Sequence, residues 1–190
     1  MTKIALIEGH PDPDPARYSR ALADAYAAGA VSGRHEVRRI AVANLDFPLL
    51  RTRTQWAEEP APAAIAQAQE TIAWSQHLVV VYPLWLGDMP ALLKGFLEQV
   101  ARPGFAVQEG ARPPGLLAGR SARLIVTMGM PALVYRFYFG AHSVKSFERN
   151  ILGFSGVRPV RRTLIGNVEG SLRARDRWLQ TMAELGEAAI

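Results

Sequence analysis

The sequence contains no cysteine in its 190 residues. Disulfide bonds, thiolate metal sites and catalytic thiols are therefore excluded, and the composition fits a reducing compartment. Long hydrophobic runs are also missing, because no stretch approaches the roughly 20 apolar residues of a membrane-spanning helix. The first residues, Met1 to Ala5, enter a strand pattern directly and lack the charged and apolar regions of a signal peptide. We expect a cytoplasmic protein without membrane insertion.

The usual nucleotide-binding fingerprints are absent as well. The chain has neither a Gly-x-Gly-x-x-Gly sequence nor a Walker sequence with its terminal lysine. Its formal net charge of +5 would suit an anion such as nucleic acid, a membrane surface or a phosphorylated cofactor. The densest basic cluster, Arg158, Arg161 and Arg162, has no interleaved aromatic residues, and basic charge alone is weak evidence. We therefore expect no nucleic-acid partner.

Strand-like and helix-like segments alternate along the chain, whose length suits one domain spanning residues 1–190. Five apolar, β-rich runs predict strands at Lys3–Glu8, Glu36–Ala41, His77–Tyr82, Arg123–Met128 and Val157–Ile165. The spacing between them predicts helices at Ala16–Gly29, Pro62–Ser75, Pro90–Val100, Ala141–Leu152 and Ser171–Ala188. This alternation indicates an α/β fold with a doubly wound parallel sheet. Long loops are expected at Phe47–Pro62 and Pro103–Gly119.

In such a sheet, ligands bind beyond the carboxyl ends of the strands, which selects the loops Gly9–Ser19, Pro83–Pro90 and Gly129–His142. The first loop leads into a helix whose free N–H groups suit a phosphate, and His10, Arg17 and Ser19 could add donors. The alternative is a rigid, proline-rich turn in which an aspartate or Ser19 caps the helix.

The second and third loops carry different chemistry. The second places the large apolar Leu84, Trp85 and Leu86 directly after a strand, which favours a flat aromatic ligand over a buried connection or a dimer contact. In the third, Tyr135 and His142 could donate hydrogen bonds to an anion that forms during reduction. Taken alone, these two residues favour the alternative of a core tyrosine and a surface histidine.

Together the loops resemble the NAD(P)H:quinone oxidoreductase family of flavodoxin-like flavoproteins. The most specific part is the stretch from Tyr82 to Phe96, which ends in Pro-Ala-Leu-Leu-Lys-Gly-Phe; the opening Gly-His-Pro of the first loop is a second match. The resemblance covers nearly the whole chain. It implies a flavodoxin-like fold, a doubly wound five-stranded parallel sheet with strand order 2-1-3-4-5.

The resemblance also implies roles for individual residues. It assigns the flavin phosphate to the first loop, with His10, Tyr18 and Ser19; Arg17, a possible donor of the same loop, is counted with them as a cofactor-binding residue. The isoalloxazine ring would lie among the residues of the other two loops, namely Pro83, Leu84, Trp85, Leu86, Thr127, Met128, Gly129 and Met130. The catalytic residues would be Tyr135 and His142, which stabilise the reduced flavin, and no metal site is implied. Leu86, Met128 and Met130 depart from the family pattern.

The implied activity is two-electron reduction of quinones or similar small acceptors, with NAD(P)H as hydride donor and a ping-pong cycle. The cofactor would be FMN or FAD, and the short chain favours FMN. The family is dimeric, so a homodimer with its active site at the subunit interface is expected. Two alternatives stay open: an ancillary redox-regulatory subunit of a glutathione-gated potassium-efflux antiporter, and a flavodoxin-type electron carrier, which the basic charge disfavours.

Overall fold

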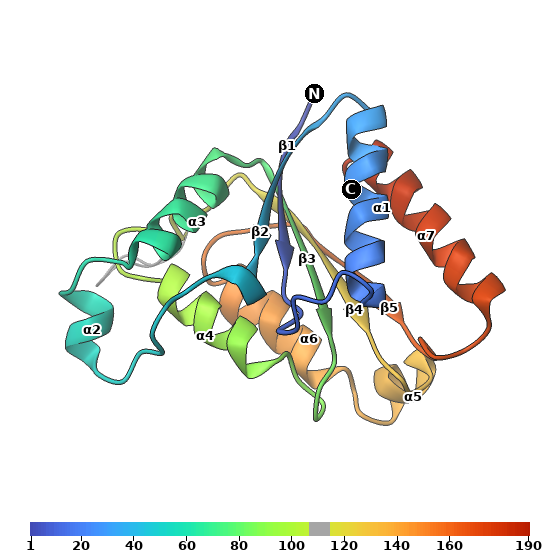
Figure 1. The fold of residues 1–190 in the computed structure, drawn as a ribbon. Coiled ribbons are helices and arrows are strands. Elements are labelled where there is room, and N and C mark those ends of the chain that lie inside the picture. Colours follow the sequence, from blue (N-terminus) through green and yellow to red (C-terminus); the bar gives the residue numbers. More distant parts are fainter. Residues whose placement is uncertain (107–114) are drawn as a thin grey trace.

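The strands form one parallel sheet in a computed structural model that describes residues 1–106 and 115–190. The strand order is β2-β1-β3-β4-β5, as expected for the flavodoxin-like fold, and the sheet is visible at the centre of Figure 1. The strands are β1 (Lys3–Glu8), β2 (Glu36–Ala41), β3 (His77–Pro83), β4 (Ser121–Thr127) and β5 (Val160–Ile165). The central β3 is buried along its whole length, because helices cover both faces of a doubly wound sheet.

The helices agree with the predicted periodicity where they are long. They are α1 (Tyr18–Ser32), α2 (Arg53–Ala57), α3 (Ala63–Trp74), α4 (Ala91–Val100), α5 (Ala132–Phe137), α6 (His142–Ser146) and α7 (Leu172–Glu187), with the short η1 (Val42–Asn44) and the π-helix η2 (Phe147–Leu152). The predicted serine cap of the last helix is confirmed, since Ser171 Oγ accepts a hydrogen bond from the Ala174 N–H.

Several predicted boundaries were wrong. The short helices α2 and α5 were not predicted, because five or six residues show too little of the helical period. The predicted helix Ala141–Leu152 is divided into α6 and a π-helical segment. The strand predicted at Val157–Ile165 begins at Val160 in the structure, three residues later than predicted. It follows Pro159, which has no N–H to donate. The predicted loop Pro103–Gly119 lies partly outside the described residues.

Two helical layers enclose the sheet (Figure 1). Helices α1 and α7 cover one face, where Leu22, Tyr26 and Met182 pack on the strands. Helices α3, α4 and α6, with η2, cover the other face through side chains such as Phe96 and Phe147. Alternate residues of each strand enter the two clusters, as the pleat requires.

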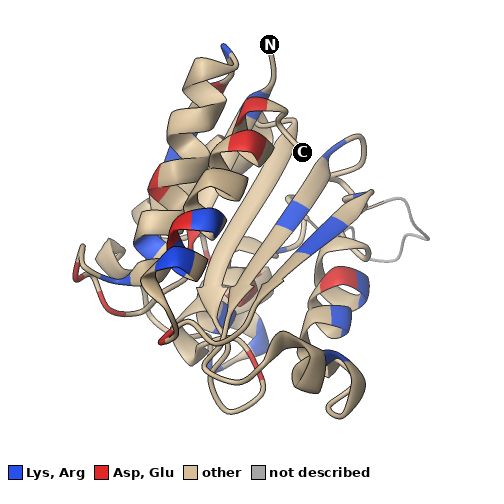
Figure 2. Ribbon diagram, turned by 90° about the vertical axis from the view of Figure 1, so that its right-hand side faces the viewer, with Lys and Arg blue, Asp and Glu red and all other residues tan. Residues whose placement is uncertain are grey.

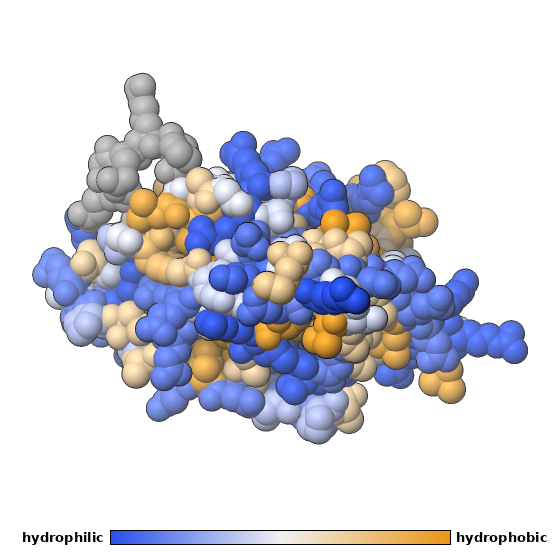
Figure 3. All heavy atoms as spheres, turned by 90° about the horizontal axis from the view of Figure 1, so that it is seen from above, coloured by the Kyte–Doolittle hydropathy of each residue, from blue (hydrophilic) through white to orange (hydrophobic). Residues whose placement is uncertain are grey.

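Exposed apolar side chains are unevenly distributed over the surface. On the face at the amino ends of the strands, hydrophobic residues occur in small groups among hydrophilic ones (Figure 3). At the carboxyl ends, by contrast, Leu86, Leu133, Phe137 and Tyr138 are all more than 60% exposed. Within the described ranges, no helix has the length and apolar character needed to cross a membrane. The carboxyl edge is therefore where binding surfaces are to be sought.

Candidate active site

The three loops selected from the sequence meet at the carboxyl edge of the sheet. The Leu84 N–H donates to the Thr127 carbonyl at 2.7 Å, which joins the second loop to the end of β4. The His10 ring stands edge-on to the Trp85 ring, with centroids 5.7 Å apart and planes at 81°. The first and second loops are therefore in direct contact, and the third begins beside them.

The first loop is held by its own aspartates. The Asp12 N–H donates to His10 Nδ1 at 3.0 Å, so the Nε2 of neutral His10 carries the proton and remains a donor. Burial lowers the pKa of His10 below its usual value, and the nearby Asp12 carboxylate opposes this effect to a smaller extent. The neutral imidazole is the form that this environment favours.

Ser19 is the residue that points most clearly to a ligand. Its hydroxyl is buried, and it has no hydrogen-bond partner among the described residues. A buried polar atom without a partner costs about 1–3 kcal/mol, so such an atom beside a hollow indicates a missing acceptor or donor. The hollow is lined by Glu8, His10, Arg17, Ser19 and others of the first loop, at the amino end of α1.

The charges around this hollow are largely compensated. Glu8 is buried at the end of β1, and its carboxylate is paired with Arg20 at 2.9 Å and with Arg39 at 2.7 Å. Arg17 is paired with Asp12 and also lies 3.7 Å from Asp14. An anion in the hollow would therefore meet Arg17 only after this arginine leaves Asp12. The importance of Asp12 was missed from the sequence, where it reads as an ordinary turn residue.

Tyr18 lies on the opposite side of the helix start. Its hydroxyl donates to the Arg175 carbonyl at 3.0 Å, and the Arg175 guanidinium lies 4.5 Å from the centre of its ring. These contacts attach the first turn of α1 to α7. The structure thus brings His10 and Ser19 to the hollow, whereas the Tyr18 hydroxyl is directed toward α7.

The second loop is a two-residue hairpin turn. Trp85 and Asp88 exchange backbone hydrogen bonds of 2.8 and 2.9 Å, and the two residues between them, Leu86 and Gly87, both have positive φ, as in a type I′ turn. Leu86 is fully exposed at its tip. A positive φ is costly for a leucine, and strain of this kind is typical of binding sites.

The residues expected around the flavin ring divide into buried and exposed groups. Pro83, Thr127 and Met128 are buried at the ends of β3 and β4, while Leu84 and Met130 are half-buried and Gly129 is exposed. A Cβ atom at Gly129 would meet nothing within 4 Å. The exposed backbone of Gly129 and the half-exposed Trp85 leave a surface onto which a flat ring could be placed.

Tyr135 and His142 lie in different surroundings, one buried and the other exposed. Tyr135 is buried, and its hydroxyl is 2.7 Å from Ser143 Oγ, whereas His142 is exposed on the first turn of α6. The Ala141 N–H donates to the Tyr135 carbonyl at 3.0 Å. Tyr135 therefore anchors the segment that presents His142, which matches the alternative of a core tyrosine and a surface histidine.

A family model described as flavodoxin-like fold matches residues 2–188. Among curated relatives, an uncharacterized NAD(P)H oxidoreductase of Haemophilus influenzae is 29% identical over 56% of this chain and 54% of that protein. An FMN-dependent NADH:quinone oxidoreductase 3 of Bacillus cereus is 29% identical over 83% of each chain. The chain spans about half the length, or less, of the first curated relatives that it matches.

Solved structures agree on the fold. The NAD(P)H:quinone oxidoreductase of Methanothermobacter marburgensis superposes with a TM-score of 0.80 at 21% sequence identity, over 99% of this chain and 96% of that one. At this level of identity the likeness establishes the fold alone. The family model, which covers almost the entire chain, goes further: the chain belongs to the family of proteins with the flavodoxin-like fold.

Proposed function

We propose that this protein is an FMN-dependent NAD(P)H oxidoreductase that reduces quinones or similar small acceptors. The observation that carries the proposal is the buried, unpartnered hydroxyl of Ser19 beside a hollow at the start of α1. The names of the relatives support the same activity, since the B. cereus protein is an FMN-dependent NADH:quinone oxidoreductase.

The residues present fit the FMN phosphate. The first N–H groups of a helix attract anions, Ser19 supplies a hydroxyl, and His10 supplies an N–H. The hollow is only about 20 Å³, room for about one water molecule, and Arg17, one of its lining residues, is paired with Asp12. We infer that binding releases Arg17 from Asp12 and turns it to the phosphate.

When bound, FMN supplies the two-electron redox chemistry, and the protein orients and shields it. Leu84, Trp85, Met130 and the backbone at Gly129 would hold the ring at the carboxyl edge of the sheet. Donor and acceptor would use the same open face in turn, which gives ping-pong kinetics.

His142 is proposed to donate a hydrogen bond to the negative charge that develops during reduction. Tyr135 is proposed to act with it, although the contacts of its hydroxyl show that it first positions the α6 segment. A Tyr135→Phe/His142→Ala double variant should slow reduction by NAD(P)H and leave FMN binding intact. Unchanged stopped-flow reduction rates would remove both residues from the mechanism.

A homodimer is proposed from the apolar surface beside the site. The tip of the second loop carries Trp85 and Leu86, and the last turn of α5 and its exit carry Val134, Tyr138 and Phe139; each is more than 40% exposed. Both groups lie at the carboxyl edge of the sheet (Figure 1). A second subunit placed there would cover apolar surface and close the open side of the flavin site.

The proposal is tested by an anaerobic absorbance spectrum of the purified protein, reconstituted with FMN, before and after addition of NADPH or NADH. Flavin bands that bleach on mixing and return with a quinone are the expected result. A protein that takes up no FMN, and does not oxidise either dinucleotide, would overturn the proposal.

A further inference from the structure

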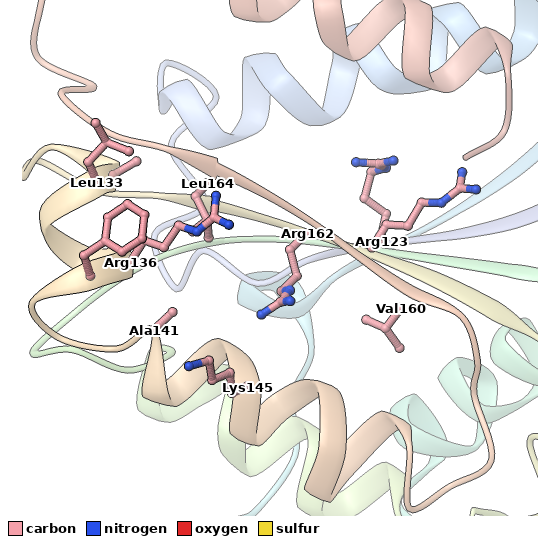
Figure 4. A pocket seen from close by; sticks show the side chains of 11 residues that line it. Arg123, Leu133, Arg136, Ala141, Lys145, Val160, Arg162 and Leu164 are labelled. Carbon is pink, nitrogen blue, oxygen red and sulfur yellow. The ribbon is translucent and has the colours of Figure 1, made fainter.

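A large cationic groove runs along the free edge of the sheet, beside the third loop. It has a volume of about 920 Å³, within the range of small-molecule sites. Its walls come from the edge strand β5, helix α5 and helix α6 (Figure 4). Five of its lining residues are basic, namely Arg123, Arg136, Lys145, Arg161 and Arg162.

Most of this positive charge is not compensated. Arg162 is paired with Glu148 at 3.3 Å, and Arg123 donates to the Thr163 hydroxyl and the Ile190 carbonyl. Within residues 1–106 and 115–190, however, no acidic side chain pairs with Arg136, Lys145 or Arg161. Figure 2 looks onto this side of the sheet, where basic bands cross the strands that face the viewer.

Protection of a sheet edge does not explain the whole cluster. Charged side chains often guard an edge strand against pairing with other chains, and Arg161 and Arg162 of β5 could serve that purpose alone. Arg136 and Lys145 come instead from two separate helices, and Figure 4 shows the Arg136 guanidinium extended along the groove toward Arg162. Cations from four elements, β4, α5, α6 and β5, thus line one hollow.

The groove begins at the third loop, beside the residues proposed to hold the flavin ring. Its lining residues Ala132 and Leu133 follow directly on Met130 and Pro131. Its other wall runs along β5 from Leu164 back to Val160, a distance of about 13 Å at the usual rise of a strand. An extended ligand could therefore place one end at the flavin ring and its middle and far end among the cations.

The groove also offers an aromatic surface and free backbone donors. Phe137 lines it and is 73% exposed; the Arg136 guanidinium lies 5.3 Å from the centre of its ring, and a purine could stack where that cation does not cover the ring. The Ala122 N–H donates to Pro159 and the Met128 N–H donates to Ile165. Because residues of a parallel strand bond to one neighbour in alternation, Arg162 and Leu164 direct their N–H groups outward, toward the groove.

We propose that this groove binds the phosphates and adenine of the nicotinamide dinucleotide donor and favours NADPH over NADH. The inference rests on the oxidoreductase function proposed above. NADH carries only the two charges of its diphosphate, whereas the extra phosphate of NADPH adds about 1.5–2 negative charges. Three cations that have no acidic partner among the described residues, together with Arg162, match the larger charge better than the smaller one.

Calorimetric titration of NADP⁺ and NAD⁺ into the flavin-loaded protein tests this, with an Arg136→Ala/Lys145→Ala double variant. Each side chain is exposed and has no ion pair within residues 1–106 and 115–190, so the fold should tolerate its loss. We expect wild-type protein to bind NADP⁺ more tightly than NAD⁺, and the variant to lose at least about tenfold in NADP⁺ affinity. The matched control, Arg173→Ala/Arg177→Ala on α7, removes the same charge from exposed positions elsewhere and should change little.

Equal weakening by the two double variants would indicate general charge attraction and overturn the assignment, as would an unchanged NADP⁺ affinity in the groove variant. The proposed activity is judged separately by the oxidation of NADPH or NADH. If the protein oxidises NADPH and NADH but the groove variant binds NADP⁺ normally, the proposed activity is supported and the groove assignment is wrong. If the protein binds NADP⁺ through the groove but oxidises neither NADPH nor NADH, the groove assignment is supported and the proposed activity is wrong.

Discussion

At the scale of single residues, the structure distinguishes side chains that are satisfied from those that are not. Arg17, Tyr18 and Tyr135 each have partners inside the subunit. Ser19 has no partner among the described residues, although it is buried; the Tyr26 and Tyr82 hydroxyls and His77 Nε2 share this property, but of the four residues it is Ser19 that lines the hollow. Unsatisfied buried groups are rare in folded proteins, so Ser19 is a more specific marker of a ligand than any charged residue of the same loop.

The Ser19→Ala variant tests this directly. Removing the hydroxyl takes away one hydrogen bond to the phosphate, so FMN affinity should fall by about five- to fifteenfold, or roughly 1–1.5 kcal/mol. The FMN-free protein should keep its thermal midpoint or gain slightly, because a buried atom without a partner is removed. Both quantities are measured by fluorescence titration and thermal unfolding. Loss of stability without loss of FMN affinity would show that the hydroxyl is structural.

His77 gives a second prediction, concerning stability and pH. Burial, with the nearby Arg123 and Arg161, lowers the pKa of His77 to about 4, while its Nδ1 is 2.7 Å from Ser121 Oγ. The unfolded chain takes up this proton near pH 6.5, so the stabilising contribution is complete above that value and is lost as the pH falls toward 4. Between about pH 7.5 and about pH 5 the loss should be about 2 kcal/mol.

Urea unfolding at the two pH values measures this effect. The His77→Gln variant should show a smaller loss between them, because its side chain does not titrate. The control His142→Gln, which removes an exposed histidine, should keep the wild-type difference. If His77→Gln keeps it as well, other groups cause the pH dependence.

At the scale of elements, close packing of α1 on α7 fixes one side of the site. A Cβ atom at Gly29 would lie 1.9 Å from the Ala183 carbonyl oxygen, and one at Gly186 would lie 2.1 Å from the Tyr26 carbonyl oxygen. The two helices therefore pack against each other at Gly29 and Gly186, where there is no room for a Cβ atom. Since α1 begins at the hollow that Ser19 lines and the Tyr18 hydroxyl donates to the Arg175 carbonyl of α7, this contact sets the direction from which α1 enters the site.

The Gly29→Ala variant should accordingly be destabilised by about 2 kcal/mol or more. In an open helix the same change would stabilise by about 1 kcal/mol, so the sign of the effect is diagnostic. Denaturant unfolding provides the measurement. Gly129→Ala, where an added Cβ meets nothing within 4 Å, is the matched control. A stabilised Gly29→Ala variant would contradict the packing.

At the scale of the whole molecule, an apolar surface and a cationic groove lie on different sides of α5. Along α5, Val134 and Tyr138 lie on one exposed side, whereas Leu133, Arg136 and Phe137 face the cationic groove. One short helix thus separates the proposed dimer surface from the proposed dinucleotide groove. We expect a dimer formed through the first surface to leave the second open to solvent.

The oligomeric state is therefore predicted to depend on the apolar side of α5. A Val134→Asp/Tyr138→Asp double variant should sediment as a monomer where wild-type protein sediments as a dimer, because charge is buried in an apolar contact. Leu172→Asp, at an exposed position on α7, should remain dimeric. Sedimentation velocity distinguishes these cases, and a wild-type monomer with full activity would refute the dimer.

The sequence by itself determined the alternation of strands and helices, and with it the parallel sheet and the three loops at its carboxyl edge. Period and composition are local properties, so the bounds of β1 and β2 were predicted to the residue. The strand order followed from the family resemblance. Short elements such as α5 escaped prediction, since tertiary contacts rather than periodicity hold them.

Only the tertiary structure decided which polar side chains have hydrogen-bond or ion-pair partners. It buried the Tyr135 hydroxyl against Ser143, held Arg17 on Asp12 and left Ser19 without a partner. It also gathered the cations of the groove from β4, α5, α6 and β5, segments whose sequences show no common pattern. Whether side chains contact each other or line the same groove depends on distances between residues far apart in the chain. Those distances arise only when the helices pack on the sheet.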